Sequence, residues 1–508
     1  MSRRKTNIWK FIHKQIGLVM TIFILLFCIS GILLNHRKAI SDYSVSRSLL
    51  PESYSIKDYN NGIIKGTVAL DNGSVVAYGC GGAWLTDKAW SRFADFNDGL
   101  PAGVDNRNIR NIVKTRDGKL WCAAQFGLYR LTDNNKWQLV ALPDNEDRLS
   151  DVALTADSSH IVVVTRSTVY TQTADGSFTP HQLKAPRGRD MKITLFKTVW
   201  QLHSGQLFGV VGITIVDIIA IVIIFLCLTG IVLYVMPYSM RKSAASGVKR
   251  KARIFKWNFK WHNKTGFATI ILTVMIAATG MCLRPPLMIP LVMIKTSPLP
   301  GSTLDNDNKW HDKLRAIRWD TARGKWLLST SEGFITVDER FAEAPELLEL
   351  RMTPPVSPMG VTVFEPTAPN QWLVGSFSGL FRWDSASGEV SDYHTNQKVC
   401  QKGGRPTGRD IVAGFSNDFN APNVVFDYVK GSDSRLPQMP AELTKLPMSL
   451  WNFALELHVG RCYTPFLGPI SDLFVFLSGL TLILVLVSGL ILRNRRHNHL
   501  KDNNKTNK

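Results

Sequence analysis

The chain has 508 residues, of which 45% are hydrophobic and 20% charged, and its formal net charge is +20. A chain of this length exceeds what one hydrophobic core usually organises, so at least two modules are expected. Nearly all of the net charge lies in three short segments, residues 1–14, 238–264 and 493–508, which flank apolar stretches. Membrane topology explains this charge pattern, so the composition argues against nucleic-acid binding.

Four apolar stretches are long enough to cross a bilayer as helices of roughly 20 residues. They are residues 16–34, 213–236, 267–283 and 469–492. The first follows a basic leader, as in a signal peptide, but its core is too long and no small-residue cleavage site follows it. By the positive-inside rule, both termini and the middle basic segment are cytoplasmic, and the two long connections lie outside.

These boundaries predict a helix, an outer connection and a helix, and the same order occurs twice. The expected segments are 1–36 (transmembrane helix 1 with a cytoplasmic N-terminus), 37–195 (outer β segment), 196–237 (interfacial helix and transmembrane helix 2), 238–264 (basic cytoplasmic loop), 265–285 (transmembrane helix 3), 286–449 (second outer β segment), 450–493 (interfacial helix and transmembrane helix 4) and 494–508 (basic cytoplasmic tail).

Both outer segments carry a weak repeat of strand, glycine turn, strand and polar turn. The clearest copies are DGKLWCAAQFGLYRLTDNNKWQLV at 117–140 and PNQWLVGSFSGLFRWDSASGEV at 369–390. Units of about 40 residues with four short strands are typical of a β-propeller, and these copies resemble the blades of bacterial periplasmic sensor propellers. The pattern predicts one propeller of six or seven blades shared by both segments. Two separate β-domains are the alternative.

Two of the apolar helices share one His and two Gly at the same spacing. The residues are His13, Gly17 and Gly31 in the first helix and His262, Gly266 and Gly280 in the third. Because an α-helix turns by 100° per residue, positions +4 and +18 return close to the angle of the His. Each helix is therefore expected to present a His near its cytoplasmic end and a bare backbone patch near its outer end.

The second and fourth helices form another matched pair. LHSGQLFGVVGITIVD at 202–217 parallels LHVGRCYTPFLGPISD at 457–472, with an Asp fourteen residues after each His. All four helices also contain Ser/Thr-Gly followed by aliphatic residues. A duplication in the same direction implies a pseudo-twofold axis along the membrane normal. This axis predicts that His13 faces His262 on the inner side, and that His203 faces His458 on the outer side.

Two histidines at one depth in a helix bundle are what bis-imidazole haem ligation requires. Glycine near a ligand leaves room for a flat macrocycle where a side chain would clash. The alternative is plain helix packing with histidines at the membrane interface, but four histidines in two matched pairs favour ligation. His36 is the nearest rival ligand, and its counterpart in the third helix is Pro285.

Two acidic residues and four cysteines complete the candidates. Asp217 and Asp472 are expected about one turn inside their helices, as a proton relay or a neighbour of a haem propionate; snorkelling to the interface is the alternative. Cys80, Cys122, Cys400 and Cys462 would lie outside, where a disulfide is feasible and its pairing is not deducible.

At these residues the chain resembles the PepSY-associated transmembrane family. Its hallmarks are H-x-x-x-G at the start of a helix, LHxG before the next helix and TG near helix ends. Here the first two are His13–Gly17 and His262–Gly266, and Leu202–Gly205 and Leu457–Gly460. Members include inner-membrane, haem-containing ferric-siderophore reductases with four helices and two haems. The outer segments depart from the family, because they read as propeller blades and not as the small α/β PepSY module.

The resemblance implies a bacterial inner-membrane reductase with two b-type haems, ligated by His13, His262, His203 and His458. Electrons would pass from a quinol or a cytosolic reductant to a periplasmic acceptor such as ferric iron or a ferric siderophore, with membrane lipid as the surrounding partner. The expected fold is a mixed membrane protein, in which a four-transmembrane-helix bundle with a twofold internal repeat joins an all-β periplasmic domain. The alternative function is a non-enzymatic, membrane-anchored propeller that acts as a ligand sensor or scaffold.

Overall fold

The computed structural model describes residues 3–143, 148–187, 192–242, 245–399, 410–420, 423–434 and 436–506. The chain forms two compact units, and each unit combines segments that are far apart in sequence. The helical unit comprises Met1–Arg37, Met191–Asp305 and Trp451–Lys508, and the sheet unit comprises Lys38–Asp190 and Asn306–Leu450. The two outer segments therefore fold as one unit and not as two β-domains. The second one begins later than expected, because residues 286–305 belong to the helical unit.

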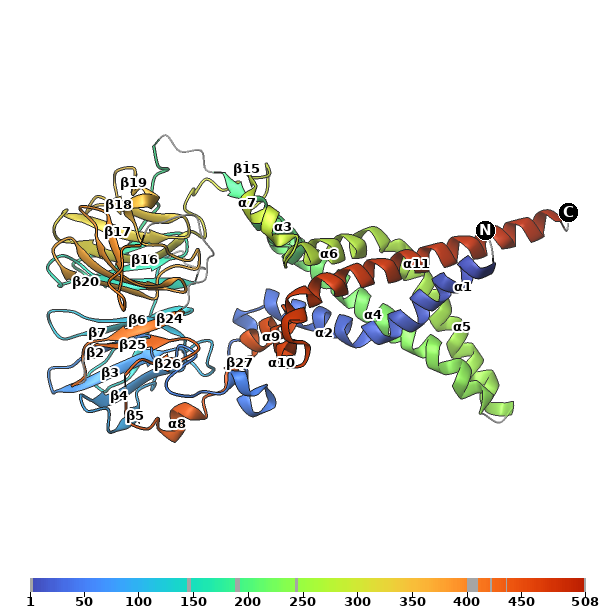
Figure 1. Cartoon of the computed structure of the whole chain (residues 1–508), viewed down its shortest axis with the longest axis horizontal. Coiled ribbons are helices and arrows are strands. Elements are labelled where there is room, and N and C mark those ends of the chain that lie inside the picture. Colours follow the sequence, from blue (N-terminus) through green and yellow to red (C-terminus); the bar gives the residue numbers. More distant parts are fainter. Residues whose placement is uncertain are drawn as a thin grey trace. The chain divides into compact units, whose positions relative to one another are not determined.

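The sheet unit contains six antiparallel sheets, three from each segment, and the strands of each sheet follow in chain order (Figure 1). The first segment forms β2 (Gly66–Ala69), β3 (Ser74–Gly79), β4 (Gly82–Asp87) and β5 (Phe93–Asp95); β6 (Ile109–Lys114), β7 (Leu120–Ala124), β8 (Gly127–Leu131) and β9 (Trp137–Val140); and β10 (Leu149–Leu154), β11 (Ile161–Thr165), β12 (Val169–Gln172) and β13 (Phe178–His181).

The second segment forms β16 (Leu314–Asp320), β17 (Lys325–Thr330), β18 (Gly333–Val337) and β19 (Glu346–Leu347); β20 (Val363–Ala368), β21 (Gln371–Ser376), β22 (Gly379–Asp384) and β23 (Glu389–Asp392); and the three strands β24 (Val412–Ser416), β25 (Val424–Asp427) and β26 (Gly431–Ser432). The unit also holds helix α8 (Ala441–Thr444) and a short pair of strands, β1 (Ser44–Val45) with β27 (Met448–Ser449). The two clearest repeat copies coincide with β7–β9 and β21–β23.

The six sheets contact one another in cyclic order through their first strands. β2 contacts β6, β6 contacts β10, β10 contacts β16, β16 contacts β20, β20 contacts β24, and β24 contacts β2. An apolar cluster lies at each of these six junctions. The strands supply these clusters because their inward-facing positions alternate with polar ones, and several central strands are apolar on both faces. Each sheet therefore buries one face against the sheet before it and one against the sheet after it.

A chain of polar contacts links neighbouring sheets, from Tyr78 on β3 through the first strands of the next four sheets. Tyr78 Oη donates to Asn111 Oδ1 at 2.6 Å, and Asn111 Nδ2 donates to Asp151 Oδ1 at 3.0 Å. Arg318 Nη1 then donates to Asp151 Oδ2 at 2.6 Å, and Arg318 Nη2 lies 3.8 Å from Glu365 Oε1. These five residues come from five different sheets. The Asp151–Arg318 pair joins the first chain segment to the second.

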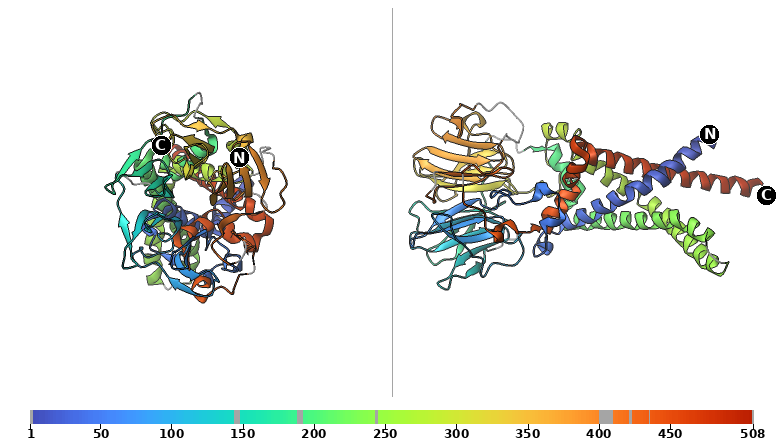
Figure 2. Two further views of the ribbon diagram at one scale, coloured as in Figure 1. Left: turned by 90° about the vertical axis from the view of Figure 1, so that its left-hand side faces the viewer. Right: turned by 60° about the horizontal axis from the view of Figure 1, so that its bottom comes forward.

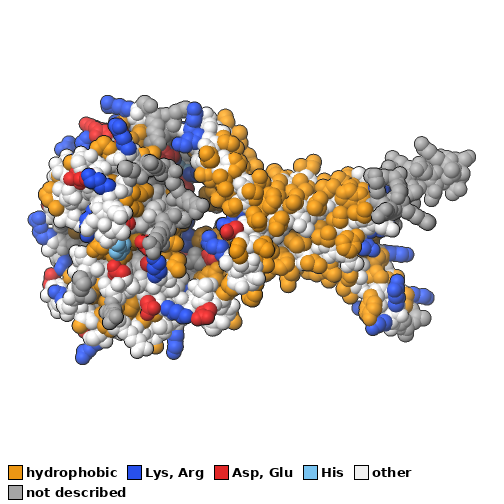
Figure 3. Space-filling view, in the orientation of Figure 1, with side chains coloured by type: hydrophobic (Ala, Val, Ile, Leu, Met, Phe, Trp, Pro, Cys, Tyr) orange, Lys and Arg blue, Asp and Glu red, His pale blue; other side chains and the backbone are white. Residues whose placement is uncertain are grey.

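The helical unit consists of α1 (Arg3–Phe11), a π-helical turn (Ile12–Ile16), α2 (Gly17–Asn35), α3 (Leu195–Ser204), α4 (Gly209–Arg241), α5 (Ala245–Ala268), α6 (Ile270–Cys282), α7 (Met288–Met293), α9 (Leu450–His458), α10 (Thr464–Leu467) and α11 (Ser471–Thr506) (Figures 1 and 2). A two-stranded pair, β14 (Ile193–Thr194) with β15 (Lys295–Thr296), also belongs to it. Hydrophobic side chains cover most of the visible surface of the helices (Figure 3), and lipid is the solvent that suits such a surface.

By length and composition, three described stretches can span a membrane: Asn7–Asn35, Gln206–Arg241 and Arg461–Arg495. A fourth span requires Gly247–Ala268 and Ile270–Cys282 to act together, although they are bent by 66° at Thr269. The basic segment 238–264, expected as a loop, is mostly helical, because it is rich in good helix formers and lacks an internal Pro after residue 237. The expected C-terminal tail likewise continues α11 as far as Thr506.

The Leu-His-x-Gly motifs end short helices. Gly205 follows α3 and Gly460 follows α9, both with φ of 81°, a left-handed conformation that glycine adopts without strain. Gly209 and Gly468, with φ of 58° and 54°, make the second half of each turn. The chain then starts the long helices α4 and α11. His203 and His458 therefore lie on separate short helices, as the length of these stretches predicts.

Breaking the buried ion pair should destabilise the sheet unit. Arg318→Met leaves Asp151, whose side chain is 5% exposed, without its charged partner, a loss that typically costs ~3–5 kcal/mol. Unfolding of the full-length protein in detergent, followed by tryptophan fluorescence, measures this. Arg351 is the matched control, because its pair with Glu349 is largely exposed and Arg351→Met should cost below ~1 kcal/mol. Equal effects of the two changes would contradict the argument.

Candidate functional site

The structure brings four histidines together as two pairs. The imidazole centroids of His13 and His262 are 6.0 Å apart, and those of His203 and His458 are also 6.0 Å apart. His13 lies in the π-helical turn and His262 on α5, whereas His203 and His458 are near the C-terminal ends of α3 and α9. These are the two pairs that the duplication predicts.

The single-stripe geometry predicted for the first and third helices does not hold along their whole length. A π-helical turn at Ile12–Ile16 interrupts the first helix, and the 66° bend at Thr269 interrupts the third. The π-helical turn contains His13, and the bend lies between His262 and Gly280, so in neither helix do the His and the distant Gly share one angle about a straight axis.

Each histidine Nδ1 lies at hydrogen-bond distance from a Ser or Thr hydroxyl on another helix. The four contacts are His13–Ser488 at 3.3 Å, His262–Thr229 at 2.9 Å, His203–Thr279 at 3.1 Å and His458–Ser30 at 3.0 Å. In two of the four, Nδ1 also lies at hydrogen-bond distance from the backbone oxygen three positions before that Ser, His13 from Val485 at 3.0 Å and His458 from Phe27 at 3.1 Å. The hydroxyl contact therefore occurs four times.

A glycine follows each of these Ser or Thr residues and makes room for the imidazole. A Cβ atom on Gly280 would lie 2.7 Å from His203 Cε1, and one on Gly489 would lie 2.8 Å from His13 Cε1. The corresponding distances are 3.3 Å for Gly31 to His458 and 3.7 Å for Gly230 to His262. Gly31 and Gly280 were expected to clear space for a macrocycle. In the structure their nearest side chains are the histidines themselves.

Gly17 and Gly266 serve helix packing. A Cβ on Gly17 would lie 3.4 Å from Val485, and one on Gly266 would lie 3.6 Å from Leu226, both ordinary contacts. Val485 and Leu226 are also the residues whose backbone meets His13 and His262. One turn after His13 the helix therefore remains close to α11, and one turn after His262 it remains close to α4.

An apolar core lies in the helical unit. It is centred on Ile24, Ile219 and Ile223, with Met20, Cys28, Cys227, Ile276 and Leu482 packed around them. Ile24 is about midway in sequence between His13 and Gly31, which abuts His458. The eighteen residues between these two positions correspond to roughly 27 Å of helix. The two histidine pairs are therefore far apart, with apolar side chains between them.

Asp217 is paired with the rival ligand His36. His36 Nε2 lies 2.7 Å from Asp217 Oδ2, and Asn35 Nδ2 donates to Asp217 Oδ1 at 3.2 Å and to the Ser204 carbonyl at 3.1 Å. Asp217 lies about two turns inside α4, deeper than expected. His36 Nε2, one of the two nitrogens through which a histidine can bind a metal, is therefore already engaged in a hydrogen bond.

Asp472 has a more distant partner than Asp217. It is in the first turn of α11, with its carboxylate 3.9 Å from Arg284 and its side chain 76% exposed. Arg284 occupies the position in the second repeat that corresponds to Asn35. The two halves thus each pair their Asp with a polar residue from the end of the preceding helix, but only Asp217 has a histidine.

Sequence reasoning missed the role of Ser30, Thr229, Thr279 and Ser488. The repeated Ser/Thr-Gly signature is visible in the sequence of all four helices, but its spacing does not indicate that the hydroxyls contact imidazoles on other helices. Cys80 and Cys122 are free thiols in the described structure, Cys462 is buried in the turn after α9, and Cys400 lies outside the described residues.

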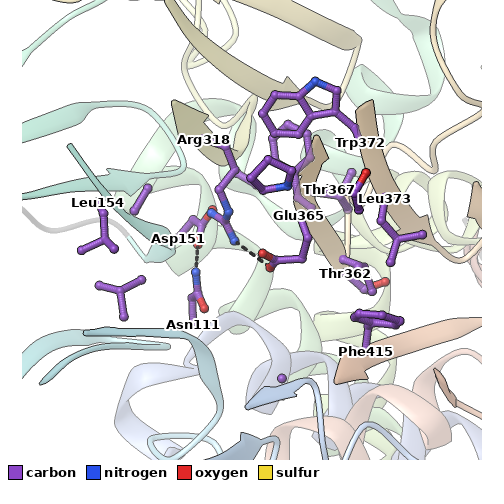
Figure 4. A pocket seen from close by; sticks show the side chains of 18 of the residues that line it. Asn111, Asp151, Leu154, Arg318, Thr362, Glu365, Thr367, Trp372, Leu373 and Phe415 are labelled. Atoms are coloured by element: carbon purple, nitrogen blue, oxygen red, sulfur yellow. Dashed lines mark hydrogen bonds and ion pairs between the residues drawn. The ribbon is translucent and has the colours of Figure 1, made fainter. Parts of the chain in front are cut away.

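The sheet unit contains a cavity of about 800 Å³. Asp151, Arg318 and Glu365 converge in it, with Thr362 and Phe415 on its wall (Figure 4). Glu365 lies deep in the unit, yet 52% of its side chain is exposed, facing this cavity. Scarce hydration raises the pKa of Glu365 above its ordinary value, while Arg318 opposes the rise. Such a cavity can hold a small polar molecule.

Comparisons with known proteins place the chain in context. The sequence model of the PepSY-associated TM region matches residues 122–496, and no curated protein matches the chain. Similar solved structures include an extracellular domain assigned to a hybrid two-component system of B. thetaiotaomicron, with 11% identity and a TM-score of 0.34 over 75% of this chain and 34% of that one. The match thus spans about a third of that protein's length.

Two other solved structures are similar to a comparable extent. Virginiamycin B lyase from Staphylococcus aureus has 8% identity and a TM-score of 0.33 over 73% of this chain and 79% of that one. A protein of unknown function from Bacteroides thetaiotaomicron has 9% identity and a TM-score of 0.36 over 77% and 74% of the two chains. At these identities and TM-scores the likenesses carry no argument about function.

Adding a methyl group at Gly280 and adding one at Gly266 should have opposite effects on the free energy of unfolding. Gly280→Ala places a Cβ against His203, an overpacking that typically costs ~1–3 kcal/mol. Gly266→Ala meets only an ordinary contact with Leu226, so it should be neutral or stabilise the helix by up to ~1 kcal/mol. Thermal unfolding of the full-length protein in detergent compares them. A Gly266→Ala variant less stable than Gly280→Ala would contradict this assignment.

Proposed function

This chain belongs to the PepSY-associated TM region family, and from that membership and the two histidine pairs we propose that it is a di-haem, b-type membrane reductase. The observation that carries the proposal is the occurrence of two separate imidazole pairs in an apolar helical unit. We further propose a bacterial inner-membrane location with both termini cytoplasmic, because the basic segments flank the helices.

The histidine pairs fit haem ligation in spacing and in chemistry. Two imidazoles that bind one metal ion from opposite sides, at the usual ~2.0–2.1 Å per bond, have ring centres roughly 6 Å apart. Both pairs have this separation. Haem needs only two protein ligands, so one pair of imidazoles is enough for each site.

In this proposal His13 and His262 hold the inner haem, and His203 and His458 hold the outer one. When bound, haem supplies a one-electron carrier at each site. The chain's own residues orient the imidazoles, and the core around Ile24, Ile219 and Ile223 keeps water out of the space between the pairs. His36 and Asp217 form a hydrogen-bonded pair that can hold a proton beside the outer site.

The reaction class follows from one-electron carriers in a membrane. A quinol that becomes a quinone releases two electrons and two protons, and these two electrons reduce two ferric ions to ferrous ions. A cytosolic reductant is the other donor that suits the inner pair. The acceptor we propose is ferric iron or a ferric siderophore on the outer side. Membrane lipid surrounds the helices.

For the sheet unit we propose a six-bladed β-propeller in the periplasm. The cyclic contacts between first strands and the apolar cluster at each junction support it, as does the repeat of about 40 residues per sheet. Its role in the reductase would be to receive the acceptor or its carrier.

The second candidate function is a sensor or scaffold in which the helices serve only as an anchor. The cavity of about 800 Å³ around Arg318 and Glu365 favours it, because a cavity lined by charged side chains suits a small polar ligand. Haem quantification of the purified protein separates the two candidates. A haem-free protein would remove the reductase proposal and leave the sensor.

Single histidine variants should each remove one particular haem. His13→Ala and His262→Ala should lose the same haem, and the double variant should lose no more, because each change already destroys one six-coordinate site. His203→Ala and His458→Ala should behave alike on the other haem. Reduced-minus-oxidised spectra and haem quantification on purified variants measure this.

His36→Ala is the matched control for the histidine series. Its Nε2 is hydrogen-bonded to Asp217, so both haems should remain. Loss of a haem in His36→Ala together with an unchanged His458→Ala would mean that the outer site uses a different ligand.

A further inference from the structure

We propose that four Ser/Thr-Gly pairs act as histidine cradles, each of which fixes one imidazole with the lone pair of Nε2 free for a metal. The pairs are Ser30-Gly31, Thr229-Gly230, Thr279-Gly280 and Ser488-Gly489. Each lies on a different helix from the histidine that it contacts: α2 receives His458 from α9, α4 receives His262 from α5, α6 receives His203 from α3, and α11 receives His13. The inference rests on the proposed function only for the identity of the metal.

The cradle hydroxyls use their single hydrogen within their own helices. Ser30 Oγ donates to the Leu26 carbonyl at 2.6 Å, Thr229 Oγ1 to Phe225 at 2.8 Å, Thr279 Oγ1 to Met275 at 2.8 Å and Ser488 Oγ to Val485 at 2.6 Å. A hydroxyl has one hydrogen and two acceptor lone pairs. Because the hydrogen is already used, the hydroxyl accepts in its second contact, and the imidazole Nδ1–H is the donor.

The backbone carbonyls lead to the same tautomer. His13 Nδ1 lies 3.0 Å from the Val485 oxygen, and His458 Nδ1 lies 3.1 Å from the Phe27 oxygen. A carbonyl oxygen only accepts, so Nδ1 must carry the hydrogen in both residues. In a neutral imidazole with hydrogen on Nδ1, the lone pair is on Nε2. Nε2 is therefore free to coordinate a metal ion that the other histidine of the pair also binds.

The glycine completes the cradle because the imidazole occupies the place of its missing side chain. The Cβ distances at Gly280 and Gly489, 2.7 Å and 2.8 Å, are too short for any other residue. Ser and Thr often return a hydrogen bond to their own helix, as Thr273 does on α6. The cradle differs from this common arrangement in that a histidine from another helix uses the remaining lone pair.

A hydrogen bond from Nδ1 to an acceptor makes the imidazole a more basic ligand, which stabilises the oxidised state of a bound metal. Thr279→Val removes the acceptor at nearly constant volume, so the midpoint potential of the outer haem should rise while that of the inner haem stays unchanged. Haem affinity at the outer site should fall by ~10–100-fold. Thr279→Ser, which keeps the hydroxyl, should restore the wild-type potential.

Thr273→Val is the matched control on the same helix. Thr273 is fully buried, and its hydroxyl donates to Thr269 and Ile270, so its replacement should leave both potentials in place. The experiment is a potentiometric titration of full-length wild type, Thr279→Val, Thr279→Ser and Thr273→Val. Equal behaviour of Thr279→Val and Thr273→Val would overturn the cradle proposal, and so would a shift that Thr279→Ser fails to reverse.

The histidine tautomers provide a readout that is independent of haem. Nitrogen-15 NMR of histidine-labelled, full-length protein from which haem has been removed should show hydrogen on Nδ1 in all four residues. If the wild type contains no haem, the proposed function fails and the same spectrum of the haem-free protein still decides the cradle. Hydrogen on Nε2 in any cradle histidine overturns the inference, whereas hydrogen on Nδ1 in all four supports it.

Discussion

The helical unit depends on the close approach of each imidazole to the backbone of a neighbouring helix. At Gly280 and Gly489 this approach leaves no room even for a methyl group, whereas a Cβ on Gly31 would be tight and one on Gly230 would make an ordinary contact. The contact joins α3 to α6, α9 to α2, α5 to α4 and the first helix to α11. Each contact therefore packs two helices and orients a histidine at the same time, so stability and site geometry depend on the same atoms.

In the sheet unit, the comparable constraint is that every sheet needs two neighbours. Apolar clusters lie at all six junctions, and two of those junctions join the first chain segment to the second. At one of them Asp151 and Arg318 add a buried ion pair, which is stabilising only while both partners are present. The charged cavity follows from this construction, because first strands that meet around a centre leave polar side chains facing inward.

The sequence was informative wherever a pattern had a short period. Repeated strand–turn–strand motifs indicated the sheets, and matched spacings predicted which histidines would meet, because a duplicated segment repeats its contacts. It was less informative where geometry depends on other helices. The π-helical turn at Ile12–Ile16 and the bend at Thr269 leave no distinct local signal. Residues 245–264 are rich in helix formers, but their charge indicated only a cytoplasmic connection. Ser30 and Thr279 were visible as motif members, but only the packing showed that they contact imidazoles.

The interleaved order of the chain has a consequence for biogenesis. The first three sheets end at His181, but their faces at two junctions pack against residues after Asn306. At the usual ~5–20 residues per second of synthesis, the missing half emerges on the order of ten seconds or more later. During that interval an apolar sheet face and unpaired edges are exposed, a situation that favours aggregation. Folding of the sheet unit is therefore completed late and cooperatively. A holding chaperone would benefit the protein most in the interval between synthesis of the second and third apolar helices.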